Sequence, residues 1–338
     1  MPERKGKQTI ALSGRPSILG YASVVGKKEG EGPLGGGFDV VFNDTRLGEK
    51  TWEQAESRMQ KEAFTRALNK AGYSPSQVNV LFSGDLLNQN TASVFGMRET
   101  GVPFLNQFGA CSTMAQTLGL AAIFVDSGAA DVAAAVTSSH FCTAERQYRF
   151  PLEYGGQRPP TSQWTATAAG SVVVGLGGGK VHVSDVCFGK IVDMGITDAN
   201  NMGAAMAPAA ADTLLTYFED TDTTPADYDF IASGDLGVEG SALLRTLTAR
   251  EGIPLGDGYF DCGLLLYDRN RQDVHAGASG CGCSAAVLCS LILGNLEKGI
   301  WKNGLFTATG AMMSPTSSQQ GESIPGIAHV LHLHREER

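Results

Sequence analysis

A short string, Ser-Gly-Asp-Leu, occurs twice in this chain, at residues 83–86 and again at residues 233–236. Both copies end an apolar run, and each is preceded by an amphipathic helical pattern and a short turn that contains proline. Further along, Gly-Ala-Cys-Ser at residues 109–112 and a helix of small residues are echoed by residues 277–285 and another such helix. Matching units in the same order predict two related halves. We place their boundary near residue 190, which gives halves 1–190 and 191–338.

Strand and helix patterns alternate in each half. The helix at residues 51–70 has the clearest signal, because Ala55, Met59 and Ala63 recur at helical spacing and Gly72 can end it. The alternation predicts an α/β fold with a mixed, mostly parallel sheet in each half. Other predicted helices are 91–100, 114–127, 204–218 and 241–250, and predicted strands are 78–82, 102–105, 132–137, 170–174, 180–192, 228–232, 263–267, 305–309 and 327–333.

Composition and charge narrow the class of protein. The chain has 338 residues, of which 42% are hydrophobic, so it can bury large cores. A formal net charge of −9 and the lack of a Lys/Arg cluster argue against a nucleic-acid partner. The N-terminal residues are charged and no run of 18 apolar residues occurs, so we expect neither secretion nor a membrane span. Seven cysteines, an odd number, indicate free thiols in a reducing compartment.

Cys111 lies where a strand region gives way to the helical run 114–127. A thiol at the first turn of a helix is close to the positive end of the helix dipole and to unpaired backbone N–H groups. Both favour a thiolate and can hold an anionic oxygen beside it. Most free cysteines, in contrast, are small buried hydrophobes. We therefore expect Cys111 to lie in a pocket, and the sequence leaves open whether it is a nucleophile.

These features together resemble the thiolase-like superfamily. The resemblance is carried by residues 109–113, by the duplicated units, by the small-residue strand 168–175 and by Gly310 in a turn after a long strand. It implies a thiolase-like fold of two duplicated halves, each with a mixed five-stranded sheet and a buried central helix. It also implies a cysteine nucleophile on the buried helix of the first half, and we expect a homodimer.

Longer strings are similar to the stage V sporulation protein AD family of endospore-forming bacteria. They are residues 83–90, 108–113, 137–140, 144–147 and 202–213. Members of that family are implicated in moving dipicolinic acid into the forming spore, together with membrane proteins of the same operon. The resemblance implies dipicolinic acid as the ligand, as the free acid or as its calcium chelate. It also implies a location in the cytoplasm or at the periphery of the spore inner membrane.

The site residues depart from those of the condensing enzymes in the superfamily. Such enzymes need two groups beside the nucleophile, usually His with His or Asn, to polarise a carbonyl and transfer protons. The loop that normally carries one of them contains Asp235, and an ionised carboxylate would repel a developing oxyanion. His275 precedes a string that is one residue short of the thiolase pattern and lacks its proline. It is either a catalytic candidate or an ordinary core histidine.

A long polar segment, residues 138–167, follows a predicted strand, and we expect it to cover the pocket. His140 begins the segment and is either a pocket residue or a structural cap. Guanidinium groups grip carboxylates with two hydrogen bonds and aromatic rings stack on planar ligands, so the segment suits an aromatic dicarboxylate. The arginines are Arg146, Arg149 and Arg158, and the aromatic residues are Tyr148, Phe150, Tyr154 and Trp164.

Three short polar residues follow the repeated strands, and such residues either bind a ligand or cap the next helix. They are Asp85, Asn88 and Asp235. Cys281 and Cys283 form a Cys-x-Cys pair without the second pair that a zinc site needs, so we predict no metal and no cofactor.

We predict a degenerate, non-catalytic thiolase-like protein that binds dipicolinic acid and assists its uptake into the spore. The ligand residues would be Cys111, His140, Arg146, Arg149, Asp85, Asn88, Asp235 and Gly310. One alternative is an active acyltransferase or ketoacyl synthase, in which Cys111 is acylated, His275 or His140 is the base, and the N–H groups of Cys111 and of Gly310 or Ala311 form an oxyanion hole. A second alternative is a structural scaffold of the transport assembly.

Overall fold

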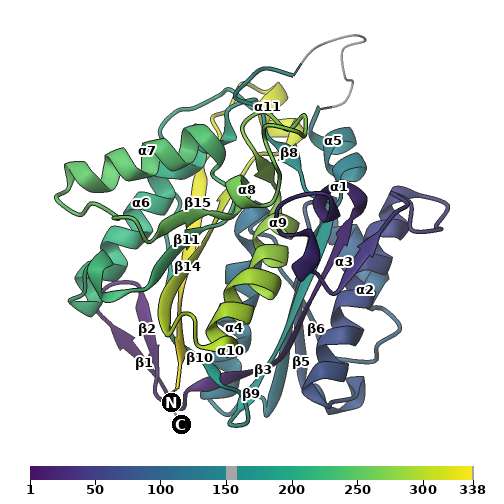
Figure 1. Cartoon of the computed structure of the whole chain (residues 1–338), viewed down its shortest axis with the longest axis vertical. Coiled ribbons are helices and arrows are strands. Elements are labelled where there is room, and N and C mark those ends of the chain that lie inside the picture. Colours follow the sequence, from purple (N-terminus) through teal and green to yellow (C-terminus); the bar gives the residue numbers. More distant parts are fainter. Residues whose placement is uncertain (150–157, 337–338) are drawn as a thin grey trace.

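The computed structural model describes residues 1–149 and 158–336, and for Arg149 it describes the backbone alone. Two sets of strands lie on either side of a central layer of helices, and further helices cover the outer face of each set (Figure 1). The N-terminus and the C-terminal end lie close together at one end of the molecule (Figure 1).

Each half contributes five strands with the same order and directions. In the first half they run β3 (Pro16–Gly26), β9 (Ala168–Leu176), β7 (Val132–Ser139), β5 (Val80–Gly84) and β6 (Phe104–Asn106). In the second half they run β10 (Val181–Phe188), β15 (Gly326–Arg335), β14 (Asn303–Ala311), β11 (Phe230–Ser233) and β12 (Tyr259–Asp261). The first three strands of each set are antiparallel and the last three are parallel. The predicted duplication into mixed five-stranded halves is therefore confirmed. The expectation that each sheet is mostly parallel was wrong, because each half has two antiparallel and two parallel pairings.

The two sets join through one antiparallel pairing, between Ser17 of β3 and His182 of β10. β10 lies before the expected boundary near residue 190, but it pairs with β15 of the second half. We therefore count β10 with the strands of the second half. Small additions flank the sheet. They are β1 (Pro2–Lys5), β2 (Thr9–Leu12), β4 (Val40–Phe42) and the separate pair β8 (Trp164–Thr165) with β13 (Ala278–Ser279).

Two outer helices of equal length show the duplication most directly. α2 (Trp52–Ala71) covers the first set of strands and α6 (Met202–Thr221) covers the second. Each begins at a side-chain cap, because Thr51 accepts from the N–H of Gln54 at 3.2 Å and Asn201 accepts from that of Ala204 at 3.3 Å. α2 ends at Gly72, whose φ of +77° suits the left-handed conformation of a helix stop. The smaller partners are α3 (Thr91–Met97) and α7 (Gly237–Arg250).

The central layer contains α4 (Thr113–Asp126) from the first half and a continuous helical run from the second. That run comprises α9 (Cys281–Val287), a π-helical turn η6 (Leu288–Ile292) and α10 (Leu293–Lys298). By length and hydropathy the stretch Cys281–Lys298 is apolar enough to cross a bilayer, but 67% of it is buried inside the fold. Its hydrophobicity therefore reflects its place between the two sets of strands.

The remaining helices are short. They are α1 (Lys27–Gly30), α5 (Phe141–Arg149), α8 (Cys262–Leu265), α11 (Pro315–Gln319), and the 3-10 turns η1 (Gly35–Gly37), η2 (Pro75–Gln77), η3 (Asn88–Asn90), η4 (Ala110–Ser112) and η5 (Pro225–Asp227).

Three local predictions were wrong. Residues 263–267, predicted as a strand, begin inside α8, because the side chain of Asp261 accepts from the N–H of Leu264 and caps a helical turn. A short apolar run does not distinguish the two structures. The polar segment 138–167, for which no helix was predicted, contains α5. Gly310, placed in a turn, lies inside β14 and pairs with Ile327.

Candidate ligand site around Cys111

Cys111 lies in the 3-10 turn η4, immediately before the buried helix α4. The turn is tight, since Ala110 has a φ of +49°, a backbone conformation that residues other than glycine rarely adopt. Strand β14 passes directly behind it, and a Cβ atom added to Gly310 would lie 2.2 Å from the carbonyl oxygen of Gly109. Gly310 is therefore needed for close packing of the second half against the cysteine turn.

A small cavity of about 40 Å³ opens beside Cys111. Both halves and the covering segment contribute to its walls, which are mostly apolar. The lining residues are Leu86, Ala110, Cys111, Ala144, Glu145, Tyr148, Thr165, Met202, Ser279, Ala311 and Met313. A cavity of this size has room for about three water molecules.

The thiol of Cys111 has acidic and apolar neighbours. Burial raises its pKa well above the ordinary value, and the adjacent Asp235 carboxyl and Cys281 thiol raise it further. The backbone N–H of Gly280, at the start of α9, opposes this shift but does not reverse it. A nucleophilic cysteine requires a lowered pKa. The surroundings therefore keep Cys111 as a neutral thiol, although it lies at the start of a helix.

Asp235 is fully buried, and desolvation raises its pKa to about 7. Its Oδ2 accepts from the N–H of Gly280 at 2.7 Å. The Cys111 thiol and the Thr309 hydroxyl lie beside the carboxyl, but within the described part of the chain its Oδ1 has no hydrogen bond of full geometry. Asp235 thus stands next to the thiol with one oxygen poorly satisfied.

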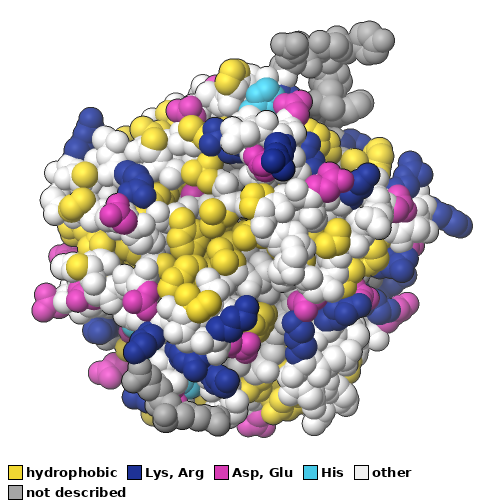
Figure 2. Space-filling view, viewed as in Figure 1, with side chains coloured by type: hydrophobic (Ala, Val, Ile, Leu, Met, Phe, Trp, Pro, Cys, Tyr) yellow, Lys and Arg dark blue, Asp and Glu magenta, His cyan; other side chains and the backbone are white. Residues whose placement is uncertain are grey.

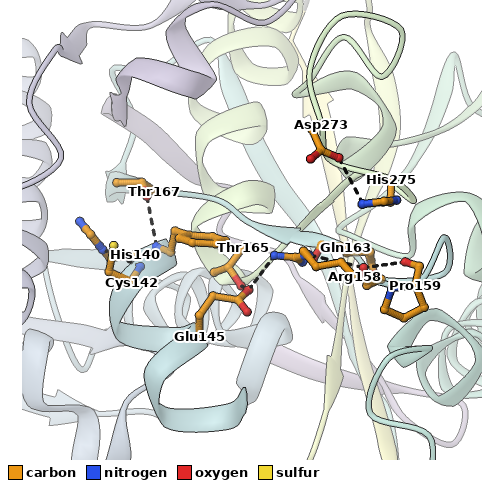
Figure 3. A network of polar contacts seen from close by, with 12 residues as sticks. His140, Cys142, Glu145, Arg158, Pro159, Gln163, Thr165, Thr167, Asp273 and His275 are labelled. Carbon is orange, nitrogen blue, oxygen red and sulfur yellow. Dashed lines mark hydrogen bonds and ion pairs between the residues drawn. The ribbon is translucent and has the colours of Figure 1, made fainter. Parts of the chain in front are cut away.

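Helix α5 covers the cavity and is held down at three points. The hydroxyl of Tyr148 and the side-chain amide of Gln147 both donate to the carbonyl of Leu86. Glu145, 5% exposed, forms an ion pair with Arg158 at 3.5 Å. Figure 3 shows Arg158 lying between Glu145 of α5 and the segment that carries Gln163, to whose carbonyl it also donates. Arg158 therefore links helix α5 to the segment that carries Gln163.

Aromatic rings and cations meet beside this ion pair. The rings of Phe141 and Trp164 stack with centroids 3.9 Å apart and planes 12° apart. The guanidinium of Arg158 lies 5.0 Å from the Trp164 ring centroid, and the ammonium of Lys28 lies 3.5 Å from it. Of the predicted arginines and aromatic residues, the structure brings Arg158 and Trp164 together next to the cavity. Phe150 and Tyr154 lie outside the described residues.

His140 is placed away from the cavity lining. It is 1% exposed, its Nδ1 accepts from the N–H of Cys142 at 3.1 Å, and its Nε2 lies 2.8 Å from the carbonyl of Thr45. These partners require a neutral ring that carries its proton on Nε2. Burial lowers its pKa, which favours the same neutral form. The ring links the end of β7 to the loop around Thr45.

His275 also lies apart from Cys111. Its Nε2 is 3.1 Å from the carboxylate of Asp273, and it is not among the residues that line the cavity. Figure 3 shows the His275 ring facing the carboxylate of Asp273. No imidazole of the described residues lines the cavity beside the thiol.

Two further predicted ligand residues line a separate surface hollow. Arg146 pairs with Glu53 of α2, and the N–H of Asn88 donates to the side chain of Gln147 at 2.9 Å. The side chain of Arg149 lies outside the described residues.

Asp85 is buried and holds the loop before α3. Its Oδ1 accepts from the N–H of Leu87 at 2.8 Å, and its Oδ2 accepts from the N–H and the hydroxyl of Ser93 at 2.8 and 2.7 Å. Burial raises its pKa and that of nearby Glu56, the latter to about 8. Both carboxylate oxygens of Asp85 thus accept hydrogen bonds from its own loop and from the start of α3.

Tyr148, one of the aromatic residues predicted in the covering segment, lines the cavity, but sequence reasoning missed several other lining residues. Glu145 lies on the same face of α5 as Tyr148, and their spacing could have revealed the helix. Met202, Ser279 and Met313 come from distant segments and carry no local signal. Among residues 1–149 and 158–336, no group of three or more His, Cys, Asp or Glu side chains is arranged to hold a metal ion.

A sequence-family model and a known protein both match this chain over most of its length. The sequence model of the family described as Stage V sporulation protein AD matches residues 6–334. Stage V sporulation protein AD of Bacillus subtilis (strain 168) is 44% identical over 324 residues, which cover 96% of each chain.

Solved structures show the fold. The 3-oxoacyl-[acyl-carrier-protein] synthase III from Aquifex aeolicus superposes with a TM-score of 0.59 at 16% identity, covering 95% of this chain and 100% of that one. A variant of OleA from Xanthomonas campestris gives a TM-score of 0.54 at 16% identity, covering 94% and 98%. The predicted thiolase-like fold is therefore confirmed.

Proposed function

The chain belongs to the stage V sporulation protein AD family, and on that premise we propose that its central cavity binds dipicolinic acid and does not catalyse condensation. In this proposal the protein captures the aromatic dicarboxylate and passes it to membrane proteins of the same operon for uptake into the developing spore. Release to a partner requires only modest affinity.

The main support for a non-catalytic role is that the carboxyl of Asp235 lies beside the thiol of Cys111. A condensing enzyme needs a base or a hydrogen-bond donor at that place to stabilise an oxyanion. Asp235 instead raises the pKa of the thiol, and the histidines at positions 140 and 275 contact Thr45 and Asp273. Among the described residues, the cavity lining contains neither the histidine nor the asparagine that a condensing enzyme places beside its nucleophile.

Binding of a ring with two carboxylates requires the cover to open, because the cavity holds only about three waters. Arg158 lies beside the lining, because it is paired with the lining residue Glu145. A ligand carboxylate can replace Glu145 on the guanidinium. Stacking of the ligand ring on Trp164 would require Lys28 or Phe141 to move away from that ring. Glu145, once displaced, disfavours a free dianion next to it and is a good ligand for the calcium of a chelate.

Calorimetry with dipicolinate, with and without Ca²⁺, tests the proposal. We expect saturable binding to the wild type and a loss of about tenfold or more in Arg158→Ala, since a charge-assisted carboxylate contact is removed. Arg146→Ala is the matched control, because Arg146 pairs with Glu53 in a different hollow. Equal losses in both variants would contradict the assignment to Arg158.

Mass spectrometry after incubation with acetyl-CoA separates binding from acyl transfer. We expect no acyl adduct on Cys111, whose thiol stays protonated. An adduct that turns over would establish the acyltransferase alternative and overturn the proposal. Absence of both acylation and dipicolinate binding, with membrane-protein association retained, would favour the scaffold.

We also propose that a second copy of the chain docks on strand β6, the free edge of the first five-stranded set. Its flank exposes apolar side chains, namely Val94 (40%), Phe95 (55%), Leu105 (42%) and Phe108 (41%). Unpaired strand edges pair readily with other chains, and a twofold axis would set the two β6 strands side by side. Light scattering should give a dimer for the wild type and a monomer for Leu105→Lys. Leu243→Lys, on α7 and also 40% exposed, should remain dimeric.

A further inference from the structure

A carboxyl group on the inner face of α2, that of Glu56, is 0% exposed. The acidic side chains on the outer face of this helix have cations beside them. Glu62, for example, pairs with Arg66 at 2.6 Å, and Figure 2 shows acidic and basic side chains close together on the right of the molecule, where Figure 1 draws α2. Within the described residues Glu56 forms no ion pair. A carboxyl buried without a cation is costly to ionise.

The two oxygens of Glu56 contact hydroxyl groups of two other elements. Oε1 lies 2.9 Å from the hydroxyl of Ser138, near the end of β7, and Oε2 lies 2.7 Å from the hydroxyl of Thr143, in the first turn of α5. The Thr143 hydroxyl also lies 2.9 Å from the carbonyl oxygen of His140. Glu56 therefore ties the start of the covering helix to α2 and β7.

The number of hydrogen atoms in these contacts shows which form of Glu56 fits. The Thr143 hydroxyl has one hydrogen and two oxygen neighbours, and the carbonyl of His140 can only accept. An ionised Glu56 also only accepts, which leaves one of the two Thr143 contacts without a hydrogen. A Glu56 that is protonated on Oε2 donates to Thr143, Thr143 donates to His140, and Ser138 donates to Oε1. The protonated carboxyl thus satisfies every contact.

The titratable groups around Glu56 favour the same form. Burial, and after it the carboxyl of Asp85, raises the pKa of Glu56 to about 8. The thiol of Cys281, at the start of α9, is the other titratable group that faces it. The remaining titratable side chains of the elements packed against Glu56 have other neighbours, and they are Tyr21, His140, Cys142, Glu145 and Arg146.

The first turn of α5 connects Glu56 to the cavity beside Cys111. Thr143 contacts Glu56 and also lines a surface hollow of about 140 Å³, so water from this hollow reaches Glu56 when the turn moves. The same movement displaces the lining residues Ala144 and Tyr148. Because a buried charge gains hydration in this way, ionisation of Glu56 favours opening of the cavity.

We propose that Glu56 is a proton-dependent latch for α5: its protonated carboxyl holds the helix over the cavity, and loss of that proton releases the helix. The closed form binds the proton with a pKa of about 8, and hydration in the open form returns this pKa toward the ordinary 4.5. Between these values closing should weaken as the pH rises, by up to about tenfold per pH unit, and level off above about pH 8. The use of this latch to admit dipicolinate rests on the proposed function, whereas the latch itself requires no ligand.

Hydrogen-exchange mass spectrometry of the full chain without ligand tests the latch. We follow the protection factors of the α5 amides, which correct for the intrinsic effect of pH on exchange, and expect them to fall about tenfold or more from pH 6 to pH 8. Glu56→Gln can donate and accept at the same places but does not titrate, so its protection should stay constant. Glu62→Gln is the matched control on the outer face of α2 and should show the wild-type fall.

Two variants at Thr143 test the contact independently of the folding of Glu56→Gln. Thr143→Val removes the hydroxyl and should lower α5 protection at pH 6 about tenfold, whereas Thr143→Ser keeps it and should match the wild type. No fall in the wild type, an equal fall in Glu56→Gln, or full protection in Thr143→Val would overturn the inference. Since no dipicolinate is present, a failure of ligand binding in calorimetry leaves these results unchanged, and the two proposals can fail separately.

Discussion

Asp85 and Asp235 occupy the same place in the two halves, the third position of the repeated Ser-Gly-Asp-Leu string, yet their partners differ. Asp85 accepts three hydrogen bonds from its own loop, from Leu87 and Ser93. Asp235 accepts one backbone bond, from Gly280, and lies against the thiol of Cys111. One copy of the motif is therefore structural and the other is part of the site.

The difference comes from Asp261 at the end of β12. Its two oxygens accept from the N–H groups of Leu236 and Gly237, and Oδ2 also accepts from the hydroxyl of Ser233. In the second half this neighbouring carboxylate holds the loop that Asp85 holds in the first. Asp235 therefore does not hold this loop, and its carboxyl faces the thiol of Cys111. Duplicated motifs diverge most easily where a nearby residue takes over the structural role.

The strongest test of the comparison is truncation of each aspartate. Asp85→Ala leaves the N–H groups of Leu87 and Ser93 and a hydroxyl without their acceptor, and should cost about 4–5 kcal/mol of unfolding free energy. At pH 4, where Asp235 is protonated in the folded protein, Asp235→Ala loses one hydrogen bond and should cost about 1 kcal/mol. Urea denaturation of both variants measures this. Equal costs would show that the two carboxylates are equivalent.

The pH dependence of stability sharpens the comparison next. Asp235 has a pKa of about 7 in the folded protein and near 4 when unfolded, so between these values the folded state keeps a proton that the unfolded state has lost. Stability should therefore fall as the pH rises from about 4 to about 7 and level off above that.

Asp235→Asn lacks this ionisation. Relative to the wild type it should gain up to about 4 kcal/mol on going from pH 4 to pH 8. Thermal melts at both pH values test this. Parallel profiles for variant and wild type would mean that Asp235 does not titrate in this window.

Reactivity of the thiol gives a smaller effect. Because Asp235 raises the pKa of Cys111, the Asp235→Asn variant should be alkylated by iodoacetamide about tenfold faster at that residue. Peptide mass spectrometry follows the rate. Cys142, half-buried and outside the cavity lining, serves as an internal control whose rate should not change. An unchanged rate at Cys111 would contradict the assigned electrostatic coupling.

The smallest expected effect concerns the equivalent helices α2 and α6, where the halves should behave alike. Thr51→Ala and Asn201→Ala each remove a cap hydrogen bond and should each cost about 1 kcal/mol. Chemical denaturation compares the two. A clear difference would show that one helix is capped by other means.

Prediction from sequence succeeded where the signal was local and repeated. The helix at 51–70 is α2, the strands at 80 and 230 are β5 and β11, and the cysteine lies at the start of a buried helix. It failed where the deciding contact was distant. Residues 263–267 were expected to form a strand, but the side chain of Asp261 caps a helical turn there. The covering segment contains α5, which is held by contacts with Leu86 and Arg158.

The repeated motifs and the alternation of strand and helix patterns were enough to predict two related α/β halves, because both signals depend on residues close together in the sequence. The architecture of five strands in each half came from the family resemblance. Which aspartate faces the thiol, and which histidines are tied to Thr45 and Asp273, was decided only by the tertiary structure. Hydrogen bonds and pKa shifts depend on atoms within a few ångströms. Those atoms come from segments that the sequence keeps far apart and the fold brings together.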